Sequence, residues 1–175
     1  MGDERLAGLV RERGPALTAY AYLLTGDDAT AQDVVQEALI RTFSRRRSGA
    51  DVEWLEAYVR RAILHVFLDG YRKRRRWLGL VPMVADRGPA PDGPDTTAVR
   101  RADIARALAS LPPQQRAAVV LHYVDDLAVR DVADRMGVSP GTVKRYLFEG
   151  RRNLSPLLGD NEGDRIDVTT IRRTR

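Results

Sequence analysis

LAVRDVADRMGVSPGTVKRYLFEGRRNL, residues 127–154, predicts two short helices joined by a tight turn. The first helix has an apolar side whose members recur at three- and four-residue steps: Val129, Val132, Ala133 and Met136. Gly137 follows them and suits the left-handed conformation that ends many helices. Ser139 can cap the next helix with its hydroxyl group, and Pro140 suits the first helical position. The pattern therefore indicates a helix-turn-helix.

The second helix of this stretch has an apolar face and a basic outer face. The apolar face consists of Val143, Leu147, Gly150 and Leu154. The outer face carries Arg145, Glu149 and Arg152, flanked by Lys144, Phe148 and Arg151. Such side chains bind base edges and phosphates, although most charge runs are only solvated faces. Because the cap, the glycine turn and the basic face occur together, the pattern favours DNA binding.

The composition argues against several classes of protein. The chain has 175 residues, a net charge of +5 and no cysteine, which excludes disulfides, thiolate nucleophiles and Cys-based zinc sites. His65 and His122 are its two histidines, and neither has a second histidine at ligand spacing. The sequence shows neither a catalytic nucleophile paired with a general base nor a phosphate-binding loop. We therefore expect no metal, no cofactor and no enzyme activity. With no signal pattern and no membrane-spanning apolar run, the expected location is cytoplasmic.

A segment rich in proline and glycine divides the chain. Residues 79–95 contain four of the nine prolines and three glycines, which predicts an extended linker. Residues 1–76 and 104–158 each have three more basic than acidic residues, and this suits a polyanion bound at two places. We expect an all-α fold divided into a helical domain 1–76, a linker 77–96, a second helical domain 97–158 and a mostly disordered tail 159–175.

Helical periodicity and capping signals predict the individual helices, and no stretch alternates with the period of a strand. Pro15 is expected to open the first helix, Asp27 or Asp28 to cap the second, and Asp51 to cap the third. The expected helices span about Pro15 to Thr25, Asp28 to Arg46, Glu53 to Arg75, Thr97 to Ser110, Pro113 to Val124, Ala128 to Met136 and Pro140 to Leu154.

The second of these helices has more apolar surface than one core contact needs. Its core stripe is expected to be Ala31, Val34, Val35 and Ala38. Leu39 and Phe43 form a second apolar pair, beside the polar residues Gln32, Asp33, Gln36 and Glu37. Either this second face is a docking surface, or another helix of the domain covers Leu39 and Phe43.

The third helix combines basic and aromatic residues. Its core side is expected to consist of Leu55, Val59, Ala62, Ile63, Val66 and Gly70. The opposite side carries Arg61, Leu64, Leu68 and Arg72, with Trp54, His65 and Tyr71 alongside. Five successive basic residues, 72–76, are more than the one or two that would complement the helix dipole. The mixture favours a surface that follows a sugar-phosphate backbone and stacks on unpaired bases.

These motifs together resemble the bacterial sigma factors of the extracytoplasmic-function (ECF) group, over about residues 5–156. DATAQDVVQEALIRTF is similar to the polymerase-binding segment of that family. AYVRRAILHVFLDGYRKRRR is similar to its helix for the −10 element. The stretch from LPPQQR to the GTVK of the recognition helix is similar to the domain that reads the −35 element. Three motifs in this order are more specific than any one of them.

The resemblance implies partners and residue roles. Core RNA polymerase, through its β′ clamp helices and β flap, and promoter DNA would be the partners, with an anti-sigma factor as a further candidate. The docking residues would be Asp33, Gln36, Glu37, Leu39 and Phe43. The unpaired −10 strand would be held by the loop 45–51 and by Trp54, Arg61, His65, Tyr71, Arg72, Lys73, Arg74 and Arg75. The −35 element would be read by Thr142, Lys144, Arg145, Tyr146, Phe148, Glu149, Arg151 and Arg152. Asp86, Asp92 and Asp95 of the linker would lie near the path of the RNA.

Four positions depart from the family pattern. His65 stands where an Asn is usual, and Arg145, Tyr146 and Glu149 replace what are commonly Ser, Arg and Arg. Because Glu accepts from cytosine and Arg donates to guanine, these residues imply an unusual −35 sequence. The alternatives are a stand-alone helix-turn-helix regulator and a sigma-like decoy that binds an anti-sigma factor.

Overall fold

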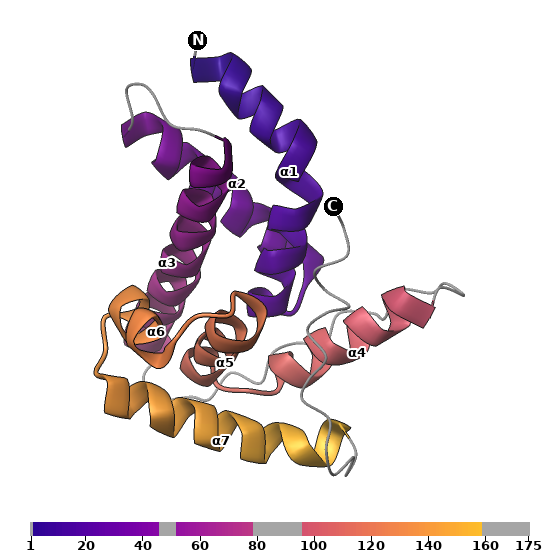
Figure 1. The fold of residues 1–175 in the computed structure, drawn as a ribbon, viewed down its shortest axis with the longest axis vertical. Coiled ribbons are helices and arrows are strands. Elements are labelled where there is room, and N and C mark those ends of the chain that lie inside the picture. Colours follow the sequence, from indigo (N-terminus) through magenta and orange to yellow (C-terminus); the bar gives the residue numbers. More distant parts are fainter. Residues whose placement is uncertain (1, 46–51, 79–95, 159–175) are drawn as a thin grey trace. The chain divides into compact units, whose positions relative to one another are not determined.

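A computed structural model describes residues 2–45, 52–78 and 96–158, which are helices joined by short turns (Figure 1). No strand occurs in these three ranges, as the sequence predicts. The chain divides into two compact units, residues 1–83 and 84–175. The cap expected at Asp51, most of the loop 45–51, the linker aspartates and the tail lie outside the described residues.

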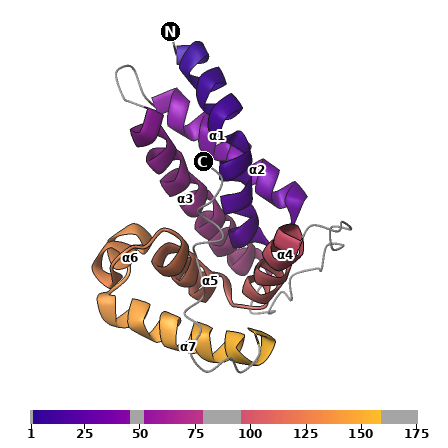
Figure 2. The ribbon, with the colours of Figure 1, turned by 45° about the vertical axis from the view of Figure 1, so that its right-hand side comes forward.

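The first unit is a bundle of three helices, α1 (Gly2–Thr25), α2 (Asp28–Arg45) and α3 (Val52–Leu78). Each helix packs against the other two, and both views show them side by side (Figures 1 and 2). The core residues without exposed surface are Leu17, Ala21 and Leu24 of α1, Ala31 and Ala38 of α2, and Val59, Ile63 and Leu64 of α3. The bundle thus buries apolar residues from all three helices against one another.

The first helix begins earlier than the sequence predicts, since α1 starts at Gly2 and Pro15 lies inside it. A proline inside a helix removes one backbone hydrogen bond, whereas a proline in the first turn removes none, so the sequence predicted a helix start at residue 15. In the structure Pro15 is exposed, while Leu9 and Leu17 on either side of it are buried in the core. Burial of these two leucines, each about 1.5–3 kcal/mol, offsets the lost bond.

The second helix begins and packs as predicted. The Asp27 carboxylate accepts a hydrogen bond from the backbone amide of Thr30 at 2.8 Å, so Asp27 is the capping residue of the two candidates. The predicted core stripe is also confirmed, because Ala31, Val34, Val35 and Ala38 are all buried.

The third helix buries a wider face than predicted. Leu64 and Leu68, which were expected on the outer side, are 0% and 5% exposed. Ala62, Val66 and Gly70, expected in the core, are only half-buried. The prediction for these residues was wrong because α3 packs against both α1 and α2 and buries two adjacent faces, whereas a wheel assumes one stripe.

The second unit consists of α4 (Thr96–Ala109), α5 (Pro113–Val119), a π-helical turn η1 (Val120–Val124), α6 (Val129–Met136) and α7 (Pro140–Leu158). The single helix predicted over 113–124 therefore changes to wider π geometry in its last turn. The Asp125 amide donates to the Val120 carbonyl at 3.2 Å, and the His122 Nδ1 donates to the Leu127 carbonyl at 2.7 Å. His122 thus has a structural role in the turn that leads to α6.

Arg116 of α5 joins the end of α4 to the core of this unit. Its guanidinium is buried and donates from Nη2 to the carbonyl oxygens of Ala109, at 2.6 Å, and Leu111, at 3.1 Å. Burial lowers the pKa of Arg116 to about 10, so the side chain stays charged at neutral pH. A charged donor in this place satisfies carbonyl groups that a helix end otherwise leaves without partners.

Candidate nucleic-acid and docking surfaces

The helix-turn-helix is built from local interactions that the sequence predicts. Gly137 has φ 66° and ψ 39°, the left-handed conformation, and the Val138 amide donates to the Ala133 carbonyl at 3.1 Å. The Ser139 hydroxyl accepts from the Thr142 amide at 3.1 Å, which caps α7. Together these interactions limit the turn between α6 and α7 to three residues, 137–139.

The apolar face of α7 is buried, as predicted. Val143, Leu147, Gly150 and Leu154 are all buried, and they pack against α5 and α6. Gly150 allows an unusually close approach, because a Cβ atom at this position would lie 2.9 Å from Cγ2 of Val119. The opposite side of α7 therefore remains available to solvent and ligands.

The outer face of α7 contains exposed residues and residues held by α5. The exposed ones are Lys144, Arg145, Phe148, Arg151 and Arg152, and Phe148 is an apolar side chain with 60% of its surface exposed. Thr142, Tyr146 and Glu149 are half-buried. The Tyr146 hydroxyl donates to Oε1 of Gln114, and the Glu149 carboxylate accepts from Nε2 of Gln115 at 2.8 Å. All eight predicted −35 residues thus lie on one helix, and α5 holds the side chains of two of them, Tyr146 and Glu149.

Near this face, Gln114 and Gln115 are residues that the sequence reasoning missed. They precede their partners Tyr146 and Glu149 by 32 and 34 positions, and nothing in the local pattern distinguishes them from surface glutamines. Gln115 also accepts a hydrogen bond through Oε1 from Nδ2 of Asn153, at 3.2 Å. Contact between helices α5 and α7 is therefore both apolar, at Gly150, and polar, along this edge.

The basic side of α3 is accessible in the structure. Arg61, His65, Arg72, Lys73 and Arg74 are exposed, and Tyr71 is half-buried. The side chains of Trp54 and Arg75 lie outside the described part of the structure. The predicted −10 residues that are described therefore occur on one long helix, but Leu64 and Leu68 do not share their surface.

His65 differs in its electrostatics from the arginines around it. Desolvation lowers the pKa of His65, and the positive charge of Arg61 lowers it further, while Asp69 raises it. A lowered pKa leaves the imidazole neutral at neutral pH, so His65 can both donate and accept a hydrogen bond. This chemistry suits a base edge better than a phosphate group.

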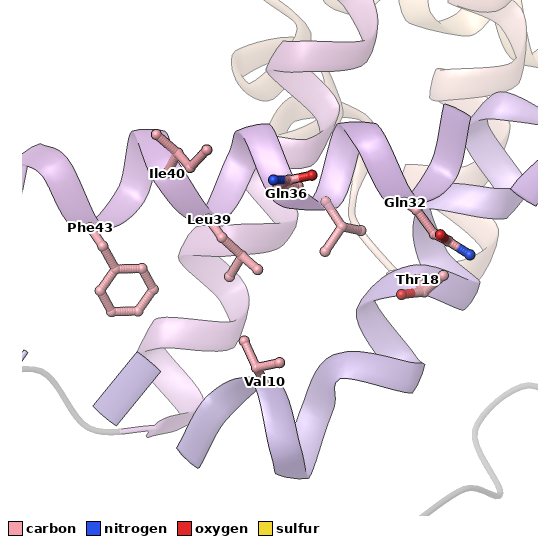
Figure 3. Close-up of a pocket in the computed structure, with 8 residues that line it drawn as sticks. Val10, Thr18, Gln32, Gln36, Leu39, Ile40 and Phe43 are labelled. Carbon is pink, nitrogen blue, oxygen red and sulfur yellow. The ribbon is translucent and has the colours of Figure 1, made fainter. Parts of the chain in front are cut away.

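The second face of α2 forms one wall of an open groove of about 360 Å³ (Figure 3). Its lining residues are Val10 and Thr18 of α1 and Gln32, Val35, Gln36, Leu39, Ile40 and Phe43 of α2. Figure 3 shows Leu39 and Phe43 pointing from α2 toward α1, and both are half-buried. Helix α1 thus covers this pair only partly, which lies between the two alternatives that the sequence left open.

The groove has an apolar rim that the sequence reasoning did not identify. Ile40 is 56% exposed and Val10 is 43% exposed, and both line the groove. Asp33 is exposed and Glu37 is half-buried on the same helix. Glu37 pairs with Arg41 at 2.7 Å, and Arg41 also lies 3.7 Å from Asp69 of α3, which contacts Arg72 at 3.5 Å. A chain of ion pairs therefore connects Glu37 of α2 to Asp69 and Arg72 of the basic helix α3.

Comparisons with known proteins match both units. The family models Sigma-70 region 2 and Sigma-70, region 4 match residues 9–77 and 101–154. The RNA polymerase sigma-E factor of Streptomyces avermitilis is 32% identical over 164 residues, which cover 94% of this chain and 89% of that protein. The ECF RNA polymerase sigma factor SigE of Mycolicibacterium smegmatis is 33% identical over 162 residues. The chain belongs to the ECF group of the sigma-70 family. The match covers 89% of this family member but only 62% of SigE.

Two solved structures share the fold of this family member. RpoE of Bartonella quintana, solved in complex with the anti-sigma factor NepR, has a TM-score of 0.59 at 24% identity. That match covers 91% of this chain and 97% of the other. CnrH, solved with the cytosolic domain of CnrY, has a TM-score of 0.54 at 23% identity, with 87% and 86% covered. At these identities the two structures support the arrangement of helices alone.

Two further observations concern membranes and metals. Among the described residues, no helix is both long and apolar enough to cross a bilayer. The same residues include no group of three or more His, Cys, Asp or Glu side chains that could hold a metal ion.

Proposed function

We propose that this chain is an initiation factor that binds core RNA polymerase and directs it to promoters through a −35 and a −10 element. The first helical domain expected from the sequence, residues 1–76, would dock on polymerase and hold the melted −10 strand. The second, residues 97–158, would read the −35 element, with residues 77–96 linking them. The observation that carries this proposal is that one ECF sigma chain has an apolar groove, acidic residues on the helix that lines it, and exposed basic side chains on α3 and α7.

The groove between α1 and α2 is the surface we assign to polymerase. Leu39, Phe43 and the exposed Ile40 supply apolar area, while Asp33 and Glu37 supply negative charge beside it. An apolar centre with a polar rim is the usual composition of a protein interface. The β′ clamp helices are the partner we propose for this groove, and the β flap is the one we propose for the second unit. The alternative function, a stand-alone helix-turn-helix regulator, does not account for this groove.

The two basic helices have different DNA substrates in this proposal. The α7 helix carries exposed arginines, a lysine and Phe148, a composition suited to a helix that reads the major groove. The α3 surface combines four exposed basic residues with the neutral His65 and with Tyr71, a composition suited to single-stranded DNA. We further propose an anti-sigma factor as a partner, because the RpoE neighbour was solved with one.

A charge reversal tests the docking surface. Glu37→Lys should reduce affinity for core polymerase by about tenfold or more, because like charges across an interface are repelled. The fold should persist, since the Glu37 and Arg41 ion pair is exposed and such pairs contribute about 0–1 kcal/mol. The matched control is Glu12→Lys, the same reversal at an exposed α1 residue that does not line the groove. Equal affinity for the wild type and both variants would reject this assignment.

Run-off transcription tests the function as a whole. The full chain, mixed with core polymerase and a genomic fragment library, should yield discrete transcripts from a common promoter sequence. Arg145→Ala should weaken binding by about 1–3 kcal/mol and relax selection at one or two −35 positions. A uniform loss on all promoters would instead mean that Arg145 contacts only phosphate.

A further inference from the structure

Two adjacent glutamines of α5 hold two side chains of the recognition helix. Gln115 donates from Nε2 to Oε2 of Glu149 at 2.8 Å, and Gln114 accepts a hydrogen bond from the Tyr146 hydroxyl. All four side chains are half-buried at the edge between α5 and α7. Half-buried side chains with specific partners lose part of their rotamer freedom, so both α7 residues are oriented before any ligand arrives.

Asn153 supports the orientation of the Gln115 amide that the Glu149 carboxylate, which only accepts hydrogen bonds, requires. Its Nδ2 donates to Oε1 of Gln115 at 3.2 Å, which leaves only the Nε2 group of Gln115 to point toward the carboxylate. A side-chain amide has one accepting and one donating end, so a reversed amide would place two oxygens together at Glu149. The three residues therefore form a directed chain from Asn153 through Gln115 to Glu149.

Glu149 carries a negative charge on a face built for a polyanion. In the described part of the chain no lysine or arginine forms an ion pair with it, and its bonded partner is the neutral Gln115 amide. A carboxylate in this place is repelled by phosphate, but it can accept a hydrogen bond from the exocyclic amino group of a base. Gln115 uses one oxygen of Glu149 and leaves the other for such a bond.

The Tyr146 ring restricts the position of the neighbouring Arg145 side chain. The Arg145 guanidinium carbon lies 5.6 Å from the centre of the Tyr146 ring, within the range of a cation–π interaction. The ring itself is held by the bond from its hydroxyl to Gln114. Gln114 therefore limits where the ring can lie, and the ring limits where the exposed Arg145 can point.

We propose that Gln114 and Gln115 are positioning residues for base selection, acting through Tyr146 and Glu149 on a base pair that presents an amino group in the major groove. This inference rests on the proposed role of α7 in reading the −35 element. It assigns specificity to a helix other than the recognition helix. It predicts that the two glutamines influence which sequence is preferred more than how tightly DNA is held.

The test uses the full chain with core polymerase and a DNA library randomised over the −35 element. Glu149→Gln first identifies the base position that Glu149 reads. At that position Gln115→Met, which keeps the side-chain volume but removes the amide, should lower the preference for an amino-bearing base by about fivefold. Affinity for non-specific DNA should change less than twofold. In the double variant Glu149→Gln with Gln115→Met, the second substitution should lower the base preference little further, because both substitutions remove the same selection.

Matched variants separate positioning from folding. Asn153→Ala should cause a smaller loss at the same base position, and Gln114→Met should reproduce the selectivity of Tyr146→Phe. Amide hydrogen exchange in α5 and α7 should be similar in all of these variants and the wild type.

The outcomes distinguish the inference from the proposed function. Unchanged base preference in Gln115→Met, while the wild type selects a −35 sequence, overturns the inference alone. Equal weakening on every sequence also overturns it, because the glutamine would then serve only the fold. A wild-type chain that selects no sequence at all overturns both.

Discussion

Gly150→Ala gives the sharpest test of how α7 is seated. Gly150 is buried where α7 crosses α5, and the added methyl group would lie 2.9 Å from Cγ2 of Val119 and 3.8 Å from Cδ1 of Leu111. Real Cβ atoms do not approach another heavy atom this closely, so the Val119 side chain or one of the two helices must shift. Overpacking of this kind costs about 1–3 kcal/mol. The higher helix propensity of alanine returns about 1 kcal/mol, which leaves a net loss of about 1 kcal/mol.

Amide hydrogen exchange of the full chain is the appropriate assay. The chain has two compact units, and both tryptophans, Trp54 and Trp77, belong to the first, so tryptophan fluorescence would not report on α7. A loss of about 1 kcal/mol corresponds to roughly fivefold faster exchange of the protected amides in α5 and α7. Exchange in α1, α2 and α3 should not change.

Two companion variants make the reasoning refutable. Gly141→Ala, in the same helix, is exposed and would bring its Cβ no closer than 3.8 Å to the Ser139 hydroxyl, so it should slow exchange or leave it unchanged. Val119→Ala removes the clashing atom, and in that background Gly150→Ala should lose most of its penalty. If Gly150→Ala were as stable as Gly141→Ala, the close approach of α5 and α7 would be wrong.

Three further predictions concern the turn and the α3 surface. Gly137→Ala should cost about 1–2 kcal/mol, because its φ of 66° is unfavourable for a residue with a Cβ, and Gly137→Asn should cost less; thermal unfolding followed by circular dichroism measures both. Ser139→Ala should cost about 0.5–2 kcal/mol through loss of the cap, and an unchanged exchange rate at the Thr142 amide would contradict this. His65 should titrate below its usual pKa of about 6.5 in an NMR experiment, and Arg61→Gln should raise that pKa. Because the folded state disfavours the protonated imidazole, the stability that His65 contributes is lost as pH falls from about 6.5 through the lowered pKa; a pKa insensitive to Arg61→Gln would contradict the cause given.

The local structure could be predicted from the sequence because its causes act over a few residues. Gly137, Ser139 and Asp27 end or begin helices through bonds that span three to five positions. The predicted apolar stripe of α2 and the apolar face of α7 are likewise buried, since one helix face meets the core in each case. The order of the three motifs was also sufficient to recognise the family.

What the tertiary structure alone decided depends on contacts between distant segments. Leu64 and Leu68 are buried because α3 packs against two other helices. A helical wheel does not show how many helices pack against the one it describes. The second apolar face of α2, which we propose as the docking surface, is a groove because α1 covers Leu39 only partly. The bond from Gln115 to Glu149 joins residues 34 positions apart. The sequence by itself therefore determined that α7 is a capped, basic recognition helix, whereas the packing of α5 against it decided which of its side chains are held and which are free.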